Sequence, residues 1–399
     1  MLNHPWYRRV GLRLPGEEIL TIEKLVYGGD GLARPDGKVI LTPFVLAGER
    51  VRAAVEREKN DLFRGRLIEV MEASGQRVVP GCPYFQRCGG CQYQHLEYAA
   101  QVENKRSILR EVLRRVGKID FDGDIGAISA EPWQYRNRVQ LHIEGGAVGY
   151  FEHGTHRLCA ISHCPISSPK LNEAISALNA NLSSVPAFTA SIDLFTNETD
   201  VQINVPDRVP RSVYTVLESL GTSGPIEYGG LRVSRNSFFQ VNRFLIDRLV
   251  ASALADWQGE TALDLYAGVG LFTVELARRF KKVTAVESGR SAFRDLQFNA
   301  KDRAHAVEAT TEEYLSRLEE RPDFILADPP RAGLGKRVIQ ELVRIRSPRL
   351  AIVACDPATL ARDLQGLLSA GYRIGRVTMV DLFPQTFHIE TIVQLEIRD

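Results

Sequence analysis

The sequence lacks any apolar run of the roughly 18 residues that a membrane-spanning helix needs. It has no basic stretch followed by an apolar one near Met1, so we expect no secretory signal, a cytoplasmic location and no membrane partner. Six cysteines in 399 residues are too few for a disulfide scaffold. An excess of charge is absent too, because 50 basic and 49 acidic residues leave a net charge of +1. Net charge therefore neither supports nor excludes a nucleic-acid partner.

The length predicts two or three domains, at roughly 100–200 residues per domain. Residues 17–70 contain short strand-like runs separated by glycine-rich turns, of which Tyr27–Gly31 is one. This pattern predicts a small all-β barrel. Small barrels either bind nucleic acid or pack against a neighbouring domain, and these residues alone favour neither role.

An amphipathic helix is predicted for Tyr98–Val116, with Gly117 as its C-cap. Its polar side carries five basic residues, which are Lys105, Arg106, Arg110, Arg114 and Arg115. A solvated helix face and an RNA contact both fit this pattern, and the first is the commoner arrangement. The following residues, up to about 235, mix strand-like and helix-like runs.

From about Asn242 onward, strand-like runs alternate with helix-like ones, which predicts a doubly wound α/β domain with a mainly parallel sheet. The predicted strands are Thr261–Leu265, Lys282–Val286, Asp323–Ala327 and Leu350–Ala354, with Arg373–Val380 and Thr391–Glu396 as edge strands. The predicted helices are Arg243–Trp257, Leu271–Phe280, Ser291–Ala304, Lys336–Ile345 and Ala358–Ala370.

The first strand of this domain leads into a glycine-rich turn, Asp264-Leu-Tyr-Ala-Gly268-Val-Gly270. Two glycines allow the backbone to turn sharply and to approach a ligand closely. Glu287 ends the next predicted strand, where an acidic side chain suits ribose hydroxyl groups. Dinucleotide enzymes share such a turn, but the D-x-x-x-G-x-G spacing differs from their G-x-G-x-x-G pattern and favours a methyltransferase.

Three more polar side chains are expected near the ligand edge of the sheet. Asp328 opens an Asp-Pro-Pro-Arg331 segment after one strand, and Cys355 follows another, directly before a helix whose N-terminus favours a thiolate. Taken singly, Cys355 would be an ordinary buried cysteine and Glu390 an ordinary surface glutamate. His388 competes with Glu390 for the role of a base.

Together these segments resemble the RNA uracil-5-methyltransferases, in particular the iron–sulfur-containing branch that modifies 23S ribosomal RNA. The matching segments, in the family's order, are Ser237-Phe-Phe-Gln240-Val-Asn242, the Asp264–Gly270 turn, Asp328-Pro-Pro-Arg331, the run from Ala354 to Leu360, and Phe383-Pro through Glu390. The resemblance implies a class I Rossmann-like methyltransferase domain over 236–399. It also implies an RNA-binding, OB-like TRAM barrel over 13–72 and a small mixed α+β central domain over 80–235.

The same resemblance implies the roles of single residues. Cys355 would add to carbon 6 of a flipped-out uracil, which makes carbon 5 able to attack a methyl group, and Glu390 would then remove the proton from carbon 5. S-adenosylmethionine would be bound by Gln240, Tyr266, Gly268, Gly270, Glu287 and Asp328. Ala267 and Asp356 stand where many relatives have cysteine and asparagine, but neither position supplies a reacting atom.

A close-set cysteine motif, Cys82-x5-Cys88-Gly-Gly-Cys91, is followed much later by Cys164-Pro165. Thiolates select zinc or iron–sulfur clusters, and spacing alone does not decide between them. The family resemblance implies a structural 4Fe-4S cluster with Cys82, Cys88, Cys91 and Cys164 as ligands. Cys159 is a rival for the fourth position.

Three alternatives stay open at this point. One is an N-methyltransferase, although Arg331 then replaces an expected aromatic residue and Cys355 has no purpose. A second is a non-catalytic RNA-binding protein, and a third is a transfer RNA substrate. We expect a monomer that acts on structured RNA, with ribosomal RNA ahead of transfer RNA.

Overall fold

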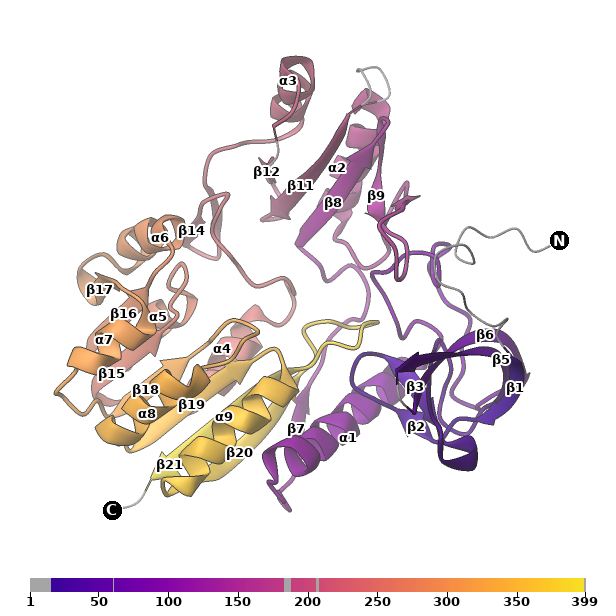
Figure 1. Cartoon of the computed structure of the whole chain (residues 1–399). Coiled ribbons are helices and arrows are strands. Elements are labelled where there is room, and N and C mark those ends of the chain that lie inside the picture. Colours follow the sequence, from indigo (N-terminus) through magenta and orange to yellow (C-terminus); the bar gives the residue numbers. More distant parts are fainter. Residues whose placement is uncertain (1–15, 60, 183–187, 206–207, 398–399) are drawn as a thin grey trace.

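The computed structural model describes residues 16–59, 61–182, 188–205 and 208–397. Three large sheets and one two-stranded hairpin organise this part of the chain (Figure 1). Residues 13–15 and 60 of the predicted barrel lie outside the described residues. Within the described ranges, every helix falls short of the length and apolar character that a membrane crossing requires.

The N-terminal unit is a six-stranded sheet in the order β1-β5-β6-β4-β3-β2, which curls around its own apolar core (Figure 1). Its side chains alternate between this core and solvent; Leu20, Ile40 and Val51 are buried in it. The strands are β1 (Gly16–Thr21), β2 (Lys24–Leu25), β3 (Asp30–Ala33), β4 (Val39–Pro43), β5 (Arg50–Lys59) and β6 (Leu62–Glu72), with a 3-10 turn at Pro35–Gly37.

The central unit is an antiparallel five-stranded sheet in the order β10-β9-β8-β11-β12, packed against helix α2. Its elements are β8 (Arg138–Glu144), β9 (Ala147–Phe151), β10 (Leu158–Ala160), α2 (Pro169–Leu182), β11 (Thr189–Thr196), β12 (Val201–Asn204) and α3 (Arg211–Leu220). The hairpin β13 (Ile226–Tyr228) and β14 (Leu231–Val233) leads into the next unit.

The C-terminal unit is an eight-stranded sheet in the order β17-β16-β15-β18-β19-β21-β20-β7, in which only β21 runs antiparallel to its neighbours. The strands are β7 (Ile125–Ile128), β15 (Gly259–Leu265), β16 (Phe280–Glu287), β17 (His305–Glu308), β18 (Phe324–Ala327), β19 (Arg349–Ala354), β20 (Tyr372–Val380) and β21 (Glu390–Ile397). The helices are α1 (Tyr98–Gly117), α4 (Ile246–Leu254), α5 (Leu271–Leu276), α6 (Arg290–Ala300), α7 (Thr311–Arg317), α8 (Gly335–Ile345) and α9 (Pro357–Ser369), with a 3-10 turn at Lys301–Arg303.

Helices cover both faces of this sheet, which explains why its central strands are continuously apolar. All four residues of β18 are buried, with apolar side chains of α4 and α5 on one face and of α8 and α9 on the other. The predicted doubly wound domain is therefore confirmed. The helix predicted over Arg243–Trp257 is shorter in the structure, and β17 and α7 were not predicted.

Helix α1 and strand β7 belong to this sheet, although the predicted central domain of residues 80–235 included them. Strand β7 pairs with β20, and Leu109 and Leu113 of α1 share an apolar core with Leu360 and Leu364 of α9. We therefore propose to group residues 98–128 with the C-terminal unit, in place of a central domain that is continuous in sequence.

Two details of α1 differ from the sequence-based prediction. The C-cap, in left-handed conformation with a φ of 55°, is Lys118 and not Gly117. A Cβ atom on Gly117 would lie 2.8 Å from the Ala361 carbonyl oxygen, so this glycine instead allows α1 to pass closely over α9.

Lys105, expected on the polar side of α1, is fully buried. Helical spacing does not reveal that this side meets another part of the chain.

Three of the four remaining basic residues of α1 make contacts within the chain. Arg106 pairs with Glu103 and Asp124, Arg110 donates to the carbonyl oxygens of Phe121 and Gly123, and Arg115 pairs with Glu111. These contacts favour the solvated helix face over the RNA contact.

Candidate active site

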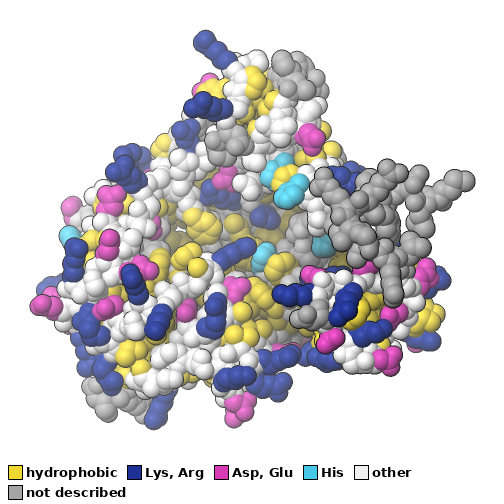
Figure 2. All heavy atoms as spheres, viewed as in Figure 1, with side chains coloured by type: hydrophobic (Ala, Val, Ile, Leu, Met, Phe, Trp, Pro, Cys, Tyr) yellow, Lys and Arg dark blue, Asp and Glu magenta, His cyan; other side chains and the backbone are white. Residues whose placement is uncertain are grey.

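The candidate site lies at the carboxyl-terminal edge of the parallel strands. In the register of the sheet, Leu265 is opposite both Val286 and Ala327, and Ala327 is opposite Ile352. The residues that follow these strand ends therefore meet at one edge. They include the glycine-rich turn, Glu287, Asp328 and Cys355. Figure 2 shows a hollow where the three units meet, with hydrophobic and basic side chains around it.

The turn after β15 has a backbone that suits glycine. Gly268 and Gly270 have φ values of 56° and 94°, and Tyr266 adopts the left-handed region as well, with a φ of 60°. A Cβ atom on Gly270 would lie 2.9 Å from Leu296, so a side chain there would collide with α6. A strained non-glycine residue such as Tyr266 is typical of functional sites, where the surrounding structure holds it in place.

Glu287 and Gln240 lie next to this turn. The Gly268 amide donates to the Glu287 carboxylate at 2.8 Å, and the Gly289 amide donates to its other oxygen. Gln240 is only 6% exposed, and its neighbour Phe239 shares an apolar core with Val269 of the turn. The structure thus places Gln240, Tyr266 and Glu287 around the same glycine-rich turn.

Cys355 and Glu390 are brought together by the reversed strand β21. Ala354 is opposite Thr391 in the antiparallel register of β19 and β21, so the next position along places Cys355 beside Glu390. Cys355 is partly exposed, whereas Glu390 is only 5% exposed. The interpretation of Glu390, taken singly, as an ordinary surface glutamate is therefore wrong. A partly open thiol beside a buried carboxyl group can combine a nucleophile with a proton acceptor.

The electrostatic environment of this pair is mainly acidic. Burial, and then the charge of Glu390, raise the pKa of Cys355 to about 11. Burial, and then Asp328, raise the pKa of Glu390 well above its ordinary value, and burial followed by Asp264 raises the pKa of Asp328 to about 7. The positive charge of Arg331 opposes both the thiol and the Glu390 shifts. The electrostatic role of Arg331 was not predicted from the sequence. There, Arg331 was noted only because it stands where an N-methyltransferase would have an aromatic residue.

This environment makes the alkylation of Cys355 strongly dependent on pH in the free protein. Because only the thiolate reacts, its labelling by iodoacetamide should keep rising between pH 7 and 10, beyond the range of an ordinary thiol of pKa about 8.5. Replacing Arg331→Ala removes a stabilising charge and should slow labelling several-fold at pH 8, whereas Glu390→Gln should accelerate it. Mass spectrometry of the peptide that contains Cys355 measures both rates. Equal rates in the two variants would contradict this electrostatic account.

His388 is the less suitable base of the two candidates. Burial lowers its pKa to about 4, with a further contribution from Arg331. A general base works best with a pKa near the working pH. Burial moves the pKa of His388 away from neutral pH, whereas it raises the pKa of Glu390 above its ordinary acidic value. His388 also lines the cavity of the cysteines, described below.

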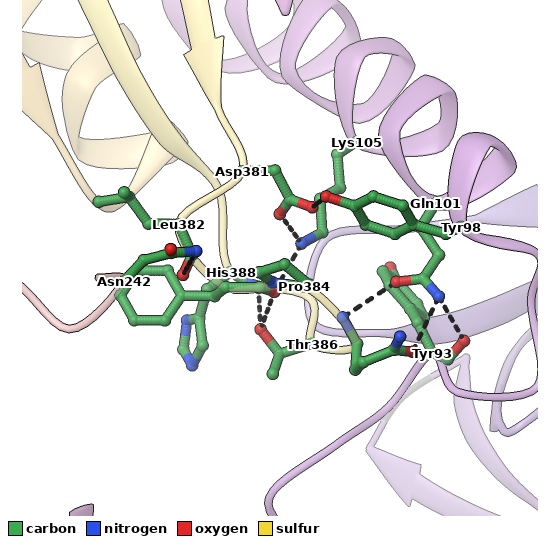
Figure 3. Close-up of polar contacts among 12 residues, drawn as sticks. Tyr93, Tyr98, Gln101, Lys105, Asn242, Asp381, Leu382, Pro384, Thr386 and His388 are labelled. Atoms are coloured by element: carbon green, nitrogen blue, oxygen red, sulfur yellow. Dashed lines mark hydrogen bonds and ion pairs between the residues drawn. The ribbon is translucent and has the colours of Figure 1, made fainter. Parts of the chain in front are cut away.

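The segment that leads to Glu390, residues 381–389, is fixed by polar contacts with α1 (Figure 3). Lys105 donates to the Asp381 carboxylate at 2.6 Å and to the Phe383 carbonyl oxygen at 2.9 Å, and the Tyr98 hydroxyl donates to the same carboxylate. Gln101 donates to the Gln385 side chain and accepts from its backbone amide. Since Lys105 and Asp381 are both fully buried, their ion pair is an anchor of this segment.

Replacing Lys105→Met should therefore destabilise the protein by about 3–5 kcal/mol, because it leaves the buried Asp381 carboxylate without its cation. Urea unfolding followed by circular dichroism measures the change in the free energy of unfolding. The matched control is Lys170→Met, which breaks an exposed pair with Glu173 and should cost less than about 1 kcal/mol. Similar losses in both variants would contradict the anchoring role.

Four cysteines, which are Cys82, Cys88, Cys91 and Cys164, line one cavity of about 310 Å³ between residues 82–94, the central unit and the segment 381–389. Cys159 instead lies fully buried in the apolar core of the central sheet. Burial raises the pKa of Cys88 to about 12, and it raises the pKa values of Cys82 and Cys91 as well. In the described ranges, no group of three or more His, Cys, Asp or Glu side chains is arranged so that it could hold a metal ion.

The doubly wound sheet with its reversed strand and glycine-rich turn defines a Rossmann-like methyltransferase domain. The family model described as tRNA (Uracil-5-)-methyltransferase matches residues 226–398. An RNA methyltransferase of Aquifex aeolicus, itself uncharacterised, is 32% identical over 95% of this chain and 98% of its own length. The 23S rRNA (uracil(1939)-C(5))-methyltransferase RlmD of Chromohalobacter salexigens is 32% identical over 94% of this chain and 88% of its own.

A solved structure extends the likeness to the whole fold. The Pyrococcus abyssi tRNA (uracil-54, C5)-methyltransferase, crystallised with S-adenosyl-L-homocysteine, superposes with a TM-score of 0.75 at 25% identity. The superposition covers 95% of this chain and all of the other. The chain therefore belongs to the RNA uracil-5-methyltransferase family, which confirms the resemblance seen in its motifs.

Proposed function

We propose that this protein transfers a methyl group from S-adenosylmethionine to carbon 5 of a uridine in structured RNA, with 23S ribosomal RNA as the substrate class. The observation that carries the proposal is the side-by-side arrangement of Cys355 and Glu390 beside the glycine-rich turn. An N-methyltransferase has no use for this pair, and neither has a protein that only binds RNA.

The proposed mechanism assigns one task to each group. S-adenosylmethionine supplies an electrophilic methyl group when bound, and Gln240, Tyr266, Gly268, Gly270, Glu287 and Asp328 would bind it. The Cys355 thiolate adds to carbon 6, so that carbon 5 becomes nucleophilic and takes the methyl group. Glu390 then accepts the proton from carbon 5, and the electrons of that bond expel the thiolate from carbon 6.

The acidic surroundings suit a two-substrate site. In the free protein, burial, and then the charge of Glu390, raise the pKa of the Cys355 thiol to about 11. A positively charged co-substrate at the same edge would lower the cost of the thiolate. The nucleophile would thus be activated only when the methyl donor is present, which protects it from unproductive reactions.

The substrate class is supported by the RNA methyltransferase relatives, and the N-terminal unit is proposed to be a TRAM barrel that holds the RNA. The 23S enzyme of Chromohalobacter salexigens favours ribosomal RNA. The structural likeness to the Pyrococcus abyssi enzyme favours transfer RNA as the second candidate.

The experiment that decides between the two compares the RNA of a deletion strain with that of its parent. Mapping 5-methyluridine in both RNA classes should reveal one missing site in 23S ribosomal RNA. Re-expression of the unaltered protein should restore it, and re-expression of the Cys355→Ala variant should not. A missing site in transfer RNA would assign the second candidate, and an unchanged pattern in both classes would contradict the proposal.

We also propose that the four cysteines of the cavity bind a structural 4Fe-4S cluster. All four thiols line the same cavity, thiolates select zinc or iron–sulfur clusters, and the family resemblance favours the cluster. In addition, the Gly90 amide donates to the Cys88 sulfur, a contact that stabilises thiolate ligands. No step of methyl transfer involves this group.

Protein purified without oxygen should therefore contain iron and sulfide in equal amounts, with broad absorbance in the visible range. Cys164→Ala should lose most of the iron, whereas the matched control Cys159→Ala should keep it, because Cys159 lies in another core. Stoichiometric zinc without iron would refute the cluster, and loss of iron in the control alone would refute the choice of Cys164.

A further inference from the structure

The N-terminal barrel contributes a side chain to the candidate active site. Tyr27 follows strand β2, and its hydroxyl group donates a hydrogen bond to the Asp356 carboxylate at 3.1 Å. Asp356 directly follows the candidate nucleophile Cys355. Tyr27 and Asp356 are 329 positions apart in the sequence, so only the packing of the barrel on the methyltransferase unit brings them together.

Asp356 uses its two oxygens for two different contacts. One oxygen accepts from the amides of Ala358 and Thr359 and so caps helix α9. The other accepts from Tyr27. Burial, and then the charge of Asp356, raise the pKa of Tyr27, so its hydroxyl remains protonated and donates at neutral pH. Cys355 also lies close enough for its charge to raise the pKa of Tyr27.

The turn that carries Tyr27 is held rigidly against the same site. The Tyr27 ring meets the Phe387 ring edge-on, at 5.7 Å between centroids, and Phe387 belongs to the segment that leads to Glu390. Gly29 has a φ of 96°, and a Cβ atom there would lie 3.0 Å from Gln92 of the cysteine segment. Leu25, just before the turn, shares the large apolar core of α9.

We infer that Tyr27 is a positioning residue of the methyl-transfer reaction: its hydrogen bond to Asp356 holds the loop of Cys355 in the geometry needed for attack on carbon 6. The barrel that is proposed to hold the RNA thereby also fixes the loop that carries the nucleophile. This inference rests on the proposed function for its kinetic consequence, but the loop contact itself is independent of the substrate.

The test uses Tyr27→Phe in the full-length protein, since phenylalanine keeps the ring on Phe387 and removes only the hydroxyl group. Methylation of unmodified RNA from the deletion strain should show a kcat reduced about 10-fold, with the KM for RNA within about twofold, because the lost bond is to a charged group. The matched control Tyr372→Phe removes a buried hydroxyl that donates to Ser347, away from the site, and should leave kcat unchanged.

A double-mutant cycle makes the role of Asp356 specific. Asp356→Ser keeps a cap for α9 but shortens the side chain, so adding Tyr27→Phe to it should cause no further loss of kcat. Equal losses from Tyr27→Phe in both backgrounds, or a loss confined to the KM, would overturn the inference.

A second measurement is independent of the substrate. Hydrogen–deuterium exchange of the amides in residues 355–360 should be about 10-fold faster in Tyr27→Phe than in the unaltered protein or in Tyr372→Phe. Unchanged exchange would overturn the positioning role even where no RNA is methylated. Faster exchange without any methylation by the unaltered protein would instead keep the loop contact and reject the proposed function.

Discussion

Cys355→Ala is expected to abolish methyl transfer and the covalent trapping of RNA that contains 5-fluorouridine. No other thiol lies beside Glu390 among the described residues, and without addition to carbon 6 the uracil carbon 5 is not nucleophilic enough to take the methyl group. The expected loss is on the order of 10⁴-fold or more, as for the removal of other enzymatic nucleophiles. Incorporation of labelled methyl groups and denaturing gels of the trapped complex measure the two effects.

The variant should still fold and bind its co-substrate. The Cys355 side chain is partly exposed, so its truncation leaves little buried volume unfilled. Calorimetric titration with S-adenosylmethionine should therefore give an affinity similar to that of the unaltered protein. Cys159→Ala is the matched control, because it removes a fully buried thiol from another core and should keep turnover. Measurable turnover or trapping by Cys355→Ala would remove the nucleophile from the mechanism.

The fold of the C-terminal unit could be predicted because its signals are local. Continuous apolar runs alternating with helical spacing indicate buried parallel strands, and the ends of such strands meet at one edge. This argument alone brings the glycine-rich turn, Glu287, Asp328 and Cys355 together. The position of Glu390 follows only from the antiparallel direction of β21, which periodicity does not reveal. The family resemblance supplied that step.

Other features could not be predicted because they depend on contacts between distant segments. Lys105 has the spacing of a solvent-facing residue, yet the segment 381–389 covers it and provides Asp381 as its partner. Strand β7 is short and joins an edge of a sheet that is otherwise formed far later in the chain. Tyr27 reads as an ordinary turn residue, and nothing near it in the sequence indicates that it meets Asp356.

These contacts share one consequence for the active site. The segment 381–389 touches α1 through Gln385, the cysteine segment through the amides of Gln92 and Tyr93, and the barrel through Phe387. It ends at Glu390. The proposed base is therefore positioned by three parts of the chain that lie outside the methyltransferase motifs.

Glu390→Gln is expected to stop the reaction after methyl transfer and to leave a stable protein–RNA adduct. Glutamine keeps the size of the side chain but cannot accept the proton from carbon 5, so the thiolate cannot leave carbon 6. Turnover should fall by about 10²–10⁴-fold, the usual contribution of a general base. Unlike the unaltered protein, which should be trapped only by 5-fluorouridine, this variant should accumulate on ordinary uridine RNA. Denaturing gels with S-adenosylmethionine labelled in its methyl group would show the label in the adduct.

The matched control is Glu396→Gln, an exposed position on the same strand that should retain full activity and form no adduct. Glutamine has nearly the same volume as glutamate and leaves no charge to bury at this 5% exposed position, so the variant should keep its thermal stability. Loss of activity therefore cannot be ascribed to unfolding if the melting temperature is kept. Full turnover by Glu390→Gln would assign the proton to another acceptor, for which His388 is the nearest candidate in the sequence. An inactive variant with no adduct would place the function of Glu390 before the addition of Cys355.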